Sequence, residues 1–123
     1  MSKTKGQIEA EISEALIQFE KEYMGRGPEE TQTYIIDDII LIRLRRVLTP
    51  AEQQLAKSDK DTRGLILVKQ VRTELLEKAR TLLNTVISDI TGQKVISLHT
   101  DISTVTGERI IVFTLNGSPI GKK

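Results

Sequence analysis

Twice in this chain, a segment with the hydrophobic period of a helix ends at a glycine and is followed by segments with the period of a strand. The two helical patterns cover residues 7–24 and 62–90. Apolar residues recur there at spacings of three and four, which places them on one side of a helix. Gly25 and Gly92 follow the patterns, and glycine readily ends a helix. The chain is therefore predicted to combine helices with strands.

Each of these glycines precedes two segments in which the residue type alternates with period two. Residues 31–36 and 39–44 flank an Asp-Asp pair, and residues 95–102 and 108–115 flank a loop at 103–107. Such alternation around a short polar break is typical of a β-hairpin. Two hairpins predict a four-stranded, mainly antiparallel sheet.

A short additional helix is predicted between the first hairpin and the long helical pattern. Thr49 is placed to cap the amide of Glu52, the Glu52 carboxylate can reach back to Thr49, and Pro50 fits the first helical position. We expect this helix to end near Ala56.

The long helical pattern would span about 40 Å at 1.5 Å per residue, whereas a domain of this size has a radius of gyration of about 14 Å. Either Gly64 delays the start of the helix, or one end projects and meets a partner, which favours a homodimer. A polar break at residues 57–61 precedes the helix, where Asp59 or Asp61 is placed to cap it. Its predicted core positions are Val68, Val71, Leu75, Ala79, Leu82, Val86 and Ile90, widened by Leu76, Leu83 and Ile87.

The expected order is helix–hairpin–helix–helix–hairpin. This order places the chain in the α+β class, with a four-stranded, mainly antiparallel sheet and helices on one face. The length of 123 residues suits one domain, so we expect residues 1–123 to form a single domain with residues 1–6 and 117–123 flexible. The core is expected to be aliphatic, because the aromatic residues are only Phe19, Tyr23, Tyr34 and Phe113.

The composition excludes several chemistries. The chain has no cysteine and one histidine, so thiol catalysis, cysteine-ligated metals and any site with two imidazoles are excluded. A net charge of +1 provides no overall attraction to nucleic acid. No apolar run approaches the roughly 18 residues of a membrane span. We therefore expect no enzymatic activity, no cofactor, no metal, no nucleic-acid partner and no membrane insertion, and we expect a cytoplasmic location.

Positive charge is concentrated at Arg43, Arg45 and Arg46, at the end of the second predicted strand. Arg43 and Arg45 share a strand face and are placed to bind a phosphate or an acidic partner. The alternative is an edge strand that its charges protect from aggregation. Arg26 lies between two glycines that follow a helix. A helix stop is favoured there over an anion site, because phosphate loops place their glycines before a helix.

The second hairpin supplies the remaining candidates. His99 and Asp101 share a strand face with Ser97, which allows proton sensing or general-base chemistry, although a hydrogen-bonded structural histidine is favoured because no nucleophile is in view. Arg109 follows the polar loop at 103–107. The candidate ligand-binding or partner-binding residues are Arg26, Arg43, Arg45, Arg46, His99, Asp101 and Arg109; none is assigned as catalytic or as a metal ligand.

Residues 99–104 (His-Thr-Asp-Ile-Ser-Thr) and 106–115 (Thr-Gly-Glu-Arg-Ile-Ile-Val-Phe-Thr-Leu) closely resemble the C-terminal signature of the MpsC-like family. The resemblance extends to residues 23–28, to Asp38 and the strand after it, and to residues 47–52, so that it covers residues 8–115. This family is named for a component of a sodium-linked system that generates membrane potential.

The resemblance implies a small, soluble accessory or regulatory protein, associated with inorganic-carbon (bicarbonate or CO2) uptake or membrane-potential generation through a membrane transporter subunit. It carries over no catalytic residue. The family pattern has glycine before the Val-Leu-Thr of the capping segment, whereas this chain has Arg46. If the glycine of the family allows an unusual backbone angle, its replacement by Arg46 changes any ligand-binding or partner-binding surface that the family shares at this position. The alternative function is a small-anion or nucleotide sensor that binds at Arg43 and Arg45. The least favoured of the possible functions is an enzyme that uses His99 and Asp101.

Overall fold

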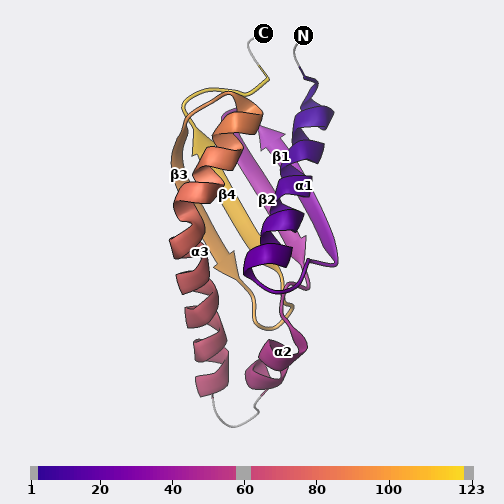
Figure 1. The fold of residues 1–123 in the computed structure, drawn as a ribbon, viewed down its shortest axis with the longest axis vertical. Helices are drawn as coiled ribbons and strands as arrows, with labels where there is room; N and C mark the ends of the chain where they lie inside the picture. Colours follow the sequence, from indigo (N-terminus) through magenta and orange to yellow (C-terminus); the bar gives the residue numbers. More distant parts are fainter. Residues whose placement is uncertain (1–2, 58–61, 121–123) are drawn as a thin grey trace.

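The structure, a computed structural model, describes residues 3–57 and 62–120, which form helices and strands in the predicted order (Figure 1). The elements are α1 (Lys5–Tyr23), β1 (Glu30–Ile36), β2 (Ile39–Arg45), α2 (Pro50–Ala56), α3 (Arg63–Thr91), β3 (Val95–Ile102) and β4 (Arg109–Leu115). The predicted α+β class is confirmed. The predicted caps at Asp59 and Asp61 lie outside the described residues.

The four strands form one sheet in the order β1-β2-β4-β3, and all neighbours are antiparallel. Ile42 of β2 lies opposite Thr33 of β1 on one side and opposite Ile111 of β4 on the other. The two hairpins therefore meet at β2 and β4, and each is preceded along the chain by its own long helix. This topology agrees with two consecutive copies of one unit, in which a helix ends at a glycine and a hairpin follows.

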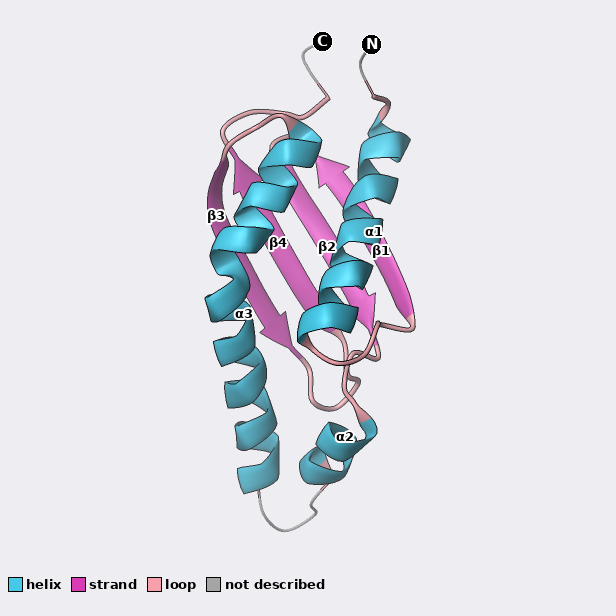
Figure 2. Cartoon of the chain, viewed as in Figure 1, coloured by secondary structure: helices cyan, strands magenta, loops and turns pink. Residues whose placement is uncertain are grey.

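Helices α1 and α3 lie side by side on one face of the sheet (Figure 2). The strand residues that face them are buried, including Ile40 and Leu44 of β2 and Ile111 and Phe113 of β4. Most of the buried core residues are aliphatic, as expected, and Phe113 is one of the few aromatic residues among them.

The opposite face of the sheet carries a second set of apolar side chains, which we call the open sheet face. Its residues are Tyr34, Ile36, Ile39, Leu41, Ile110 and Val112. Register places Leu41 between Tyr34 and Val112, and paired residues point to the same side of a sheet. Tyr34 is 41% exposed and Ile36 is 55% exposed. In residues 3–57 and 62–120, no helix lies over this face (Figure 2).

Helix α1 begins two residues earlier than the hydrophobic pattern indicates, because Thr4 starts it with a capping box. The Thr4 side chain accepts a hydrogen bond from the Gln7 N–H at 3.1 Å, and the Gln7 side chain accepts one from the Thr4 N–H at 2.7 Å. Lys5 and Gly6, which were expected to be flexible, therefore belong to the helix. Gly25 follows its end with a φ of 87°.

Helix α3 is one continuous helix of 29 residues that ends at Gly92, whose φ is 73°. Its N-terminal part extends past the sheet and lies beside α2 (Figure 1). Gly64 does not delay the helix, and one end of it extends past the sheet; that this end meets a partner stays a prediction. A Cβ atom at Gly64 would lie 2.0 Å from the carbonyl oxygen of Leu55, so glycine here permits the close approach of α2.

The predicted core stripe of α3 is wrong in part. The helix buries Val68, Arg72, Leu76, Ala79, Leu83, Ile87 and Thr91. Val71, Leu75 and Leu82, which the pattern assigns to the core, are 37–43% exposed. Apolar residues occupy more of the circumference of α3 than the sheet and α1 can cover. Packing buries the sector that contains Leu76 and Leu83 and leaves the adjacent sector in contact with solvent.

No helix in the described part of the chain has both the length and the apolar character needed to cross a lipid bilayer.

Candidate functional site

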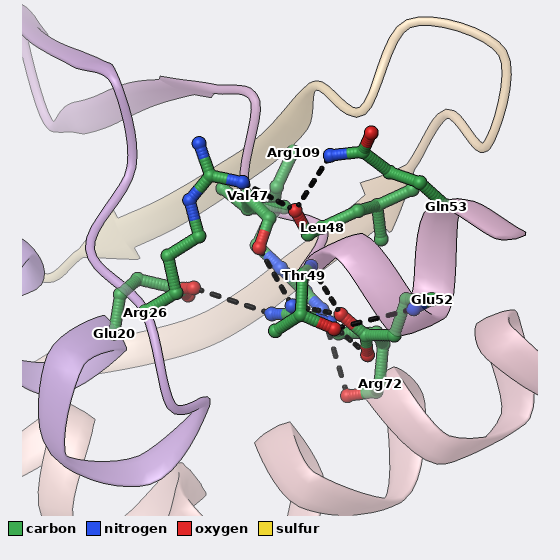
Figure 3. Close-up of polar contacts among 9 residues, drawn as sticks. All are labelled: Glu20, Arg26, Val47, Leu48, Thr49, Glu52, Gln53, Arg72 and Arg109. Atoms are coloured by element: carbon green, nitrogen blue, oxygen red, sulfur yellow. Dashed lines mark hydrogen bonds and ion pairs between the residues drawn. The ribbon is translucent and has the colours of Figure 1, made fainter.

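Four charged side chains meet inside the protein where α1, α2, α3 and β4 come together (Figure 3). Glu20 comes from α1, Glu52 from α2, Arg72 from α3 and Arg109 from β4, and we call this group the charge cluster. Glu20 and Arg72 are 0% exposed and Arg109 is 1% exposed. Two carboxylates and two guanidinium groups cancel in formal charge, as a buried set of charges must to avoid a large desolvation penalty.

Arg72 is the centre of this cluster. Its Nε donates to Glu52 Oε2 at 3.0 Å, and its Nη2 donates to Glu52 Oε1 at 2.6 Å. Nη2 also donates to the Val47 carbonyl at 2.7 Å, and Nη1 donates to Glu20 Oε1 at 3.3 Å. One side chain of α3 therefore holds α1, α2 and the segment that leads into α2.

The capping box at the start of α2 positions Glu52 for this contact. Glu52 Oε1 accepts the Thr49 N–H at 2.8 Å, and Thr49 Oγ1 accepts the Glu52 N–H at 3.2 Å, as the sequence predicts. The same carboxylate then accepts both hydrogen bonds from Arg72. Burial opposes ionisation of Glu52, but the hydrogen bonds from Arg72 and Thr49 outweigh it, so the pKa of Glu52 lies below its usual value.

Arg109 lies in the core, on the helix-facing side of β4. Its Nη1 donates to Thr100 Oγ1 at 2.8 Å, and its Nη2 lies 3.5 Å from the Arg72 carbonyl oxygen. Burial lowers the pKa of Arg109, and the negative charge of Glu20 opposes that shift. The sequence offers Arg109, next to the polar loop at 103–107, as a candidate binding residue, whereas the structure makes its guanidinium an internal group of the sheet–helix interface.

Glu20 is the carboxyl of the cluster whose pKa is raised. Burial raises its pKa above the ordinary value of 4.5, and the charges of Arg109 and Arg72 lower it by less. Its Oε2 has no hydrogen-bond partner among the residues that the structure describes. A perturbed, partly unsatisfied carboxyl is a feature of many active sites, but structural ion-pair networks share it.

Sequence reasoning missed Glu20 and Arg72, although a signal was present. Glu20 continues the series Ile8, Ile12 and Leu16 at spacings of four, and Arg72 interrupts the apolar series between Val68 and Leu76. A charged residue within the apolar stripe of one helix, matched by the opposite charge within the stripe of another, indicates a buried pair. The charge pattern of α1 alone assigns Glu20 to the solvent face, which is wrong.

A cleft of about 280 Å³ lies beside the charge cluster, and three cationic side chains line it: Arg26, Arg46 and Lys57. Arg26 Nη1 donates to the Leu48 carbonyl at 2.8 Å (Figure 3). Arg46 Nε pairs with Glu29, which also lines the cleft, at 2.8 Å. The fold therefore brings together two of the predicted binding residues, Arg26 and Arg46, which lie 20 positions apart in the sequence.

The backbone at Arg46 has the unusual angle that a glycine at this position would serve. Arg46 has a φ of 56°, in the left-handed region that disfavours residues with a Cβ atom. The next residue, Val47, donates its N–H to the Gly107 carbonyl at 2.9 Å, and Gly107 also has a positive φ of 75°. The contact between this segment and the loop at 103–107 therefore requires the left-handed turn, and Arg46 adopts it despite its side chain.

Arg43 and Arg45 lie on the same sheet face, as the alternation predicts, but each has a carboxylate partner within the chain. Arg43 pairs with Glu108, and Arg45 Nε lies 3.2 Å from Glu30 Oε1. These two carboxylates neutralise the positive charges of Arg43 and Arg45, which appear in the sequence as part of a run of arginines. An anion site at this strand stays a prediction.

His99 and Asp101 have separate partners. His99 is exposed, and its Nε2 lies 3.1 Å from Ser97 Oγ. Asp101 Oδ1 lies 3.1 Å from Lys69 Nζ of α3, and the hydrogen bond from Lys69 lowers the pKa of Asp101. Asp101 therefore links β3 to α3. Among the described residues, no group of three or more His, Asp or Glu side chains is arranged to hold a metal ion.

The sheet order, the one-sided helix layer and the charge cluster define a two-layer α+β protein in which ion pairs of Arg72 join α3 to α1 and to α2. The chain belongs to the MpsC family, described as "Na+-translocating membrane potential-generating system (MpsC)", whose sequence model matches residues 4–117. It is 46% identical over 115 residues to the uncharacterized protein YbcI of Bacillus subtilis (strain 168), an alignment that covers 94% of this chain and 90% of the relative. No solved structure matches the chain. The family resemblance found in the sequence is thus confirmed.

Proposed function

We propose that this protein is a non-enzymatic accessory or regulatory module that binds a membrane-embedded transporter subunit, in inorganic-carbon uptake or membrane-potential generation. The description of its family supports the link to membrane potential. We further propose that it acts in the cytoplasm as a homodimer of single-domain chains. The observation that carries the contact role is the open sheet face.

The open sheet face is unusual for a face that none of the described helices covers. An antiparallel sheet with one solvated face normally alternates apolar and polar residues along each strand. Here the outward positions of β2 and β4 include Ile39, Leu41, Ile110 and Val112, of which Leu41 and Val112 lie directly opposite each other. A contiguous exposed apolar patch marks an interaction surface. We therefore assign this face to the transporter subunit.

Charged pairs border the apolar patch at one end. Arg43 of β2 pairs with Glu108, and Arg45 pairs with Glu30 of β1. An apolar centre with a polar rim is the usual composition of a protein–protein interface. The free edge of β1 is less suited to a partner, because the Glu9 carboxylate accepts the Ile35 N–H at 3.0 Å and occupies that position of the edge.

The test is co-purification of the tagged protein from detergent-solubilised membranes of its own organism. We expect the wild type to retain a subunit of an ion or bicarbonate transporter, and Leu41→Glu to lose it. Val105→Glu is the control, because Val105 lies in the loop at 103–107 and is 89% exposed. Circular dichroism checks that both variants fold. Absence of any transporter subunit from the wild-type sample, or its retention by folded Leu41→Glu, would contradict the proposal.

The second candidate is a sensor of a small anion or nucleotide. Glu29 pairs with Arg46 in the cleft, but Arg26 donates there to a backbone carbonyl rather than to a carboxylate, so the cleft supports this reading better than Arg43 and Arg45, both of which have carboxylate partners. Thermal unfolding with bicarbonate, phosphate or ATP tests it. A ligand at 100 times its Kd would stabilise the fold by about 2.7 kcal/mol, and Arg26→Gln should reduce that shift. No shift with any of the three anions would argue against a sensor.

A further inference from the structure

Helix α3 exposes an apolar surface, interrupted by Lys78, which we call the α3 stripe. Its exposed apolar residues Leu67, Val71, Leu75 and Leu82 are 37–48% exposed. At about 100° per residue, these four lie within an arc of about 80° on the helix. Lys78 lies within the same arc, and half-buried Val86 lies at its border. From 67 to 86 the stripe runs about 28 Å along the helix axis.

We propose that the α3 stripe binds the α3 stripe of a second copy of this chain, with the two helices antiparallel about a two-fold axis. An interface of this symmetry must be complementary to itself. If Val71 lies opposite Leu82 of the second copy, the same register places Leu67 opposite Val86. Both pairs occur twice by symmetry. The spacing of the apolar residues is therefore self-complementary in this antiparallel register.

The charges near the axis fit this register as well. Leu75 lies opposite Lys78 of the second copy, whose methylene chain covers it while the ammonium group points outward. That ammonium group then lies next to Glu74 of the first copy. Glu74 and Lys78 are exposed, and neither has an ion-pair partner among residues 3–57 and 62–120. A parallel pair in register would instead set Glu74 beside Glu74 and Lys78 beside Lys78.

This inference names the surface of the homodimer that forms part of the proposed function. The α3 stripe belongs to the helix layer, whereas the transporter subunit is assigned to the open sheet face on the other side of the sheet (Figure 2). Self-association and transporter binding can therefore fail independently. The projection of α3 past the sheet (Figure 1) leaves the first turns of the stripe accessible to a second helix.

Disulfide cross-linking tests the register directly, because the chain has no cysteine of its own. In the proposed dimer of either Val71→Cys or Leu82→Cys, the two new thiols lie about 16 Å apart along the axis, whereas a disulfide needs Cα atoms within about 7 Å. In an equimolar mixture the two thiols face each other. We expect a cross-linked heterodimer from the mixture and none from either variant alone.

Val105→Cys mixed with Leu82→Cys is the control, because residue 105 lies in the loop at 103–107, and it should not cross-link. Light scattering on the wild type accompanies the experiment. A strict monomer at high concentration would overturn the proposal. So would cross-linking of Val71→Cys to itself, which indicates a parallel pair, or a dimer whose mixture does not cross-link, which indicates another register or another surface.

Charge reversal gives a second, independent measurement. Glu74→Lys or Lys78→Glu alone puts like charges together at two symmetric positions, and we expect the dimer to dissociate about tenfold more readily. An equimolar mixture of the two variants, or the double variant, restores opposite charges and should restore the wild-type dissociation constant. Equal dissociation constants for all four samples would contradict the proposed register.

Discussion

Arg72 and Glu52 form a two-pronged ion pair, with distances of 3.0 Å from Nε to Oε2 and 2.6 Å from Nη2 to Oε1. The same carboxylate accepts the N–H of Thr49 at the start of α2. A local helix cap and a long-range ion pair therefore share one side chain. The position of α2 against α3 depends on a residue that the sequence places in an ordinary capping box.

Removal of Arg72 should be strongly destabilising. Arg72→Met keeps much of the aliphatic volume but leaves Glu20 with one cation fewer in a buried environment, a change that costs about 3–5 kcal/mol. Urea unfolding at neutral pH measures the free energy of unfolding. The matched control is Arg80→Met, because Arg80 forms an exposed pair with Glu77 and its loss should cost under about 1 kcal/mol. Equal effects of the two variants would refute a special role for the buried pair.

Glu20 should make the stability depend on pH with a known sign. Its folded pKa is raised above 4.5, so between 4.5 and the folded pKa the folded state binds more protons than the unfolded state. The free energy of unfolding therefore falls in this window as the pH rises. Glu20→Gln removes this contribution, so the variant should gain stability relative to the wild type as the pH rises, by at most about 1.4 kcal/mol per pH unit. Urea titrations at a series of pH values measure the difference, with exposed Glu14→Gln as the control. A constant difference across the series would show that Glu20 titrates normally.

Arg46→Gly should stabilise the protein. The left-handed backbone at Arg46, with φ 56°, costs a residue with a Cβ atom about 1–2 kcal/mol, and glycine relieves that strain at a smaller entropic cost of about 0.5–1 kcal/mol. We expect a net gain of up to about 1 kcal/mol in urea unfolding. Arg45→Gly is the matched control, because Arg45 lies within β2 and should lose stability. If Arg46→Gly lost as much stability as Arg45→Gly, the side-chain contacts of Arg46 would outweigh the backbone strain.

Gly64→Ala should destabilise the protein even though alanine is the better helix former by about 1 kcal/mol. The new Cβ atom would lie 2.0 Å from the Leu55 carbonyl oxygen, so α2 and α3 would have to separate. Gly6→Ala in α1 is the control, since nothing lies within 4 Å of a Cβ atom there. That variant should be neutral or stabilising. Thermal unfolding of both variants compares them directly, and a stabilised Gly64→Ala would show that the two helices do not approach this closely.

Much of the architecture follows from local signals. The capping box at Thr49 and the glycines at 25 and 92 act within one helical turn, so their effect can be recognised without knowledge of the rest of the fold. The alternation along residues 39–44 likewise predicts which side chains of β2 share a face. The class and the order of elements were predictable for this reason.

The candidate site was less predictable. The candidate residues on the strands were His99, Asp101, Arg43 and Arg45. Their partners are Ser97, Lys69, Glu108 and Glu30, and most of these come from other elements. Which charges neutralise one another depends on distances that the chain order does not provide. The apparent arginine run is therefore a set of separate ion pairs.

The sequence by itself determined the type and order of the helices and strands and most of their ends, because capping, glycine conformation and hydrophobic period operate over a few neighbouring residues. Only the tertiary structure decided which sector of α3 is buried and that Glu20, Arg72 and Arg109 lie in the core. The physical reason is that burial of a charge is favourable only with a partner of opposite charge, and here that partner comes from another element, 52 residues along the chain in the case of Glu20 and Arg72.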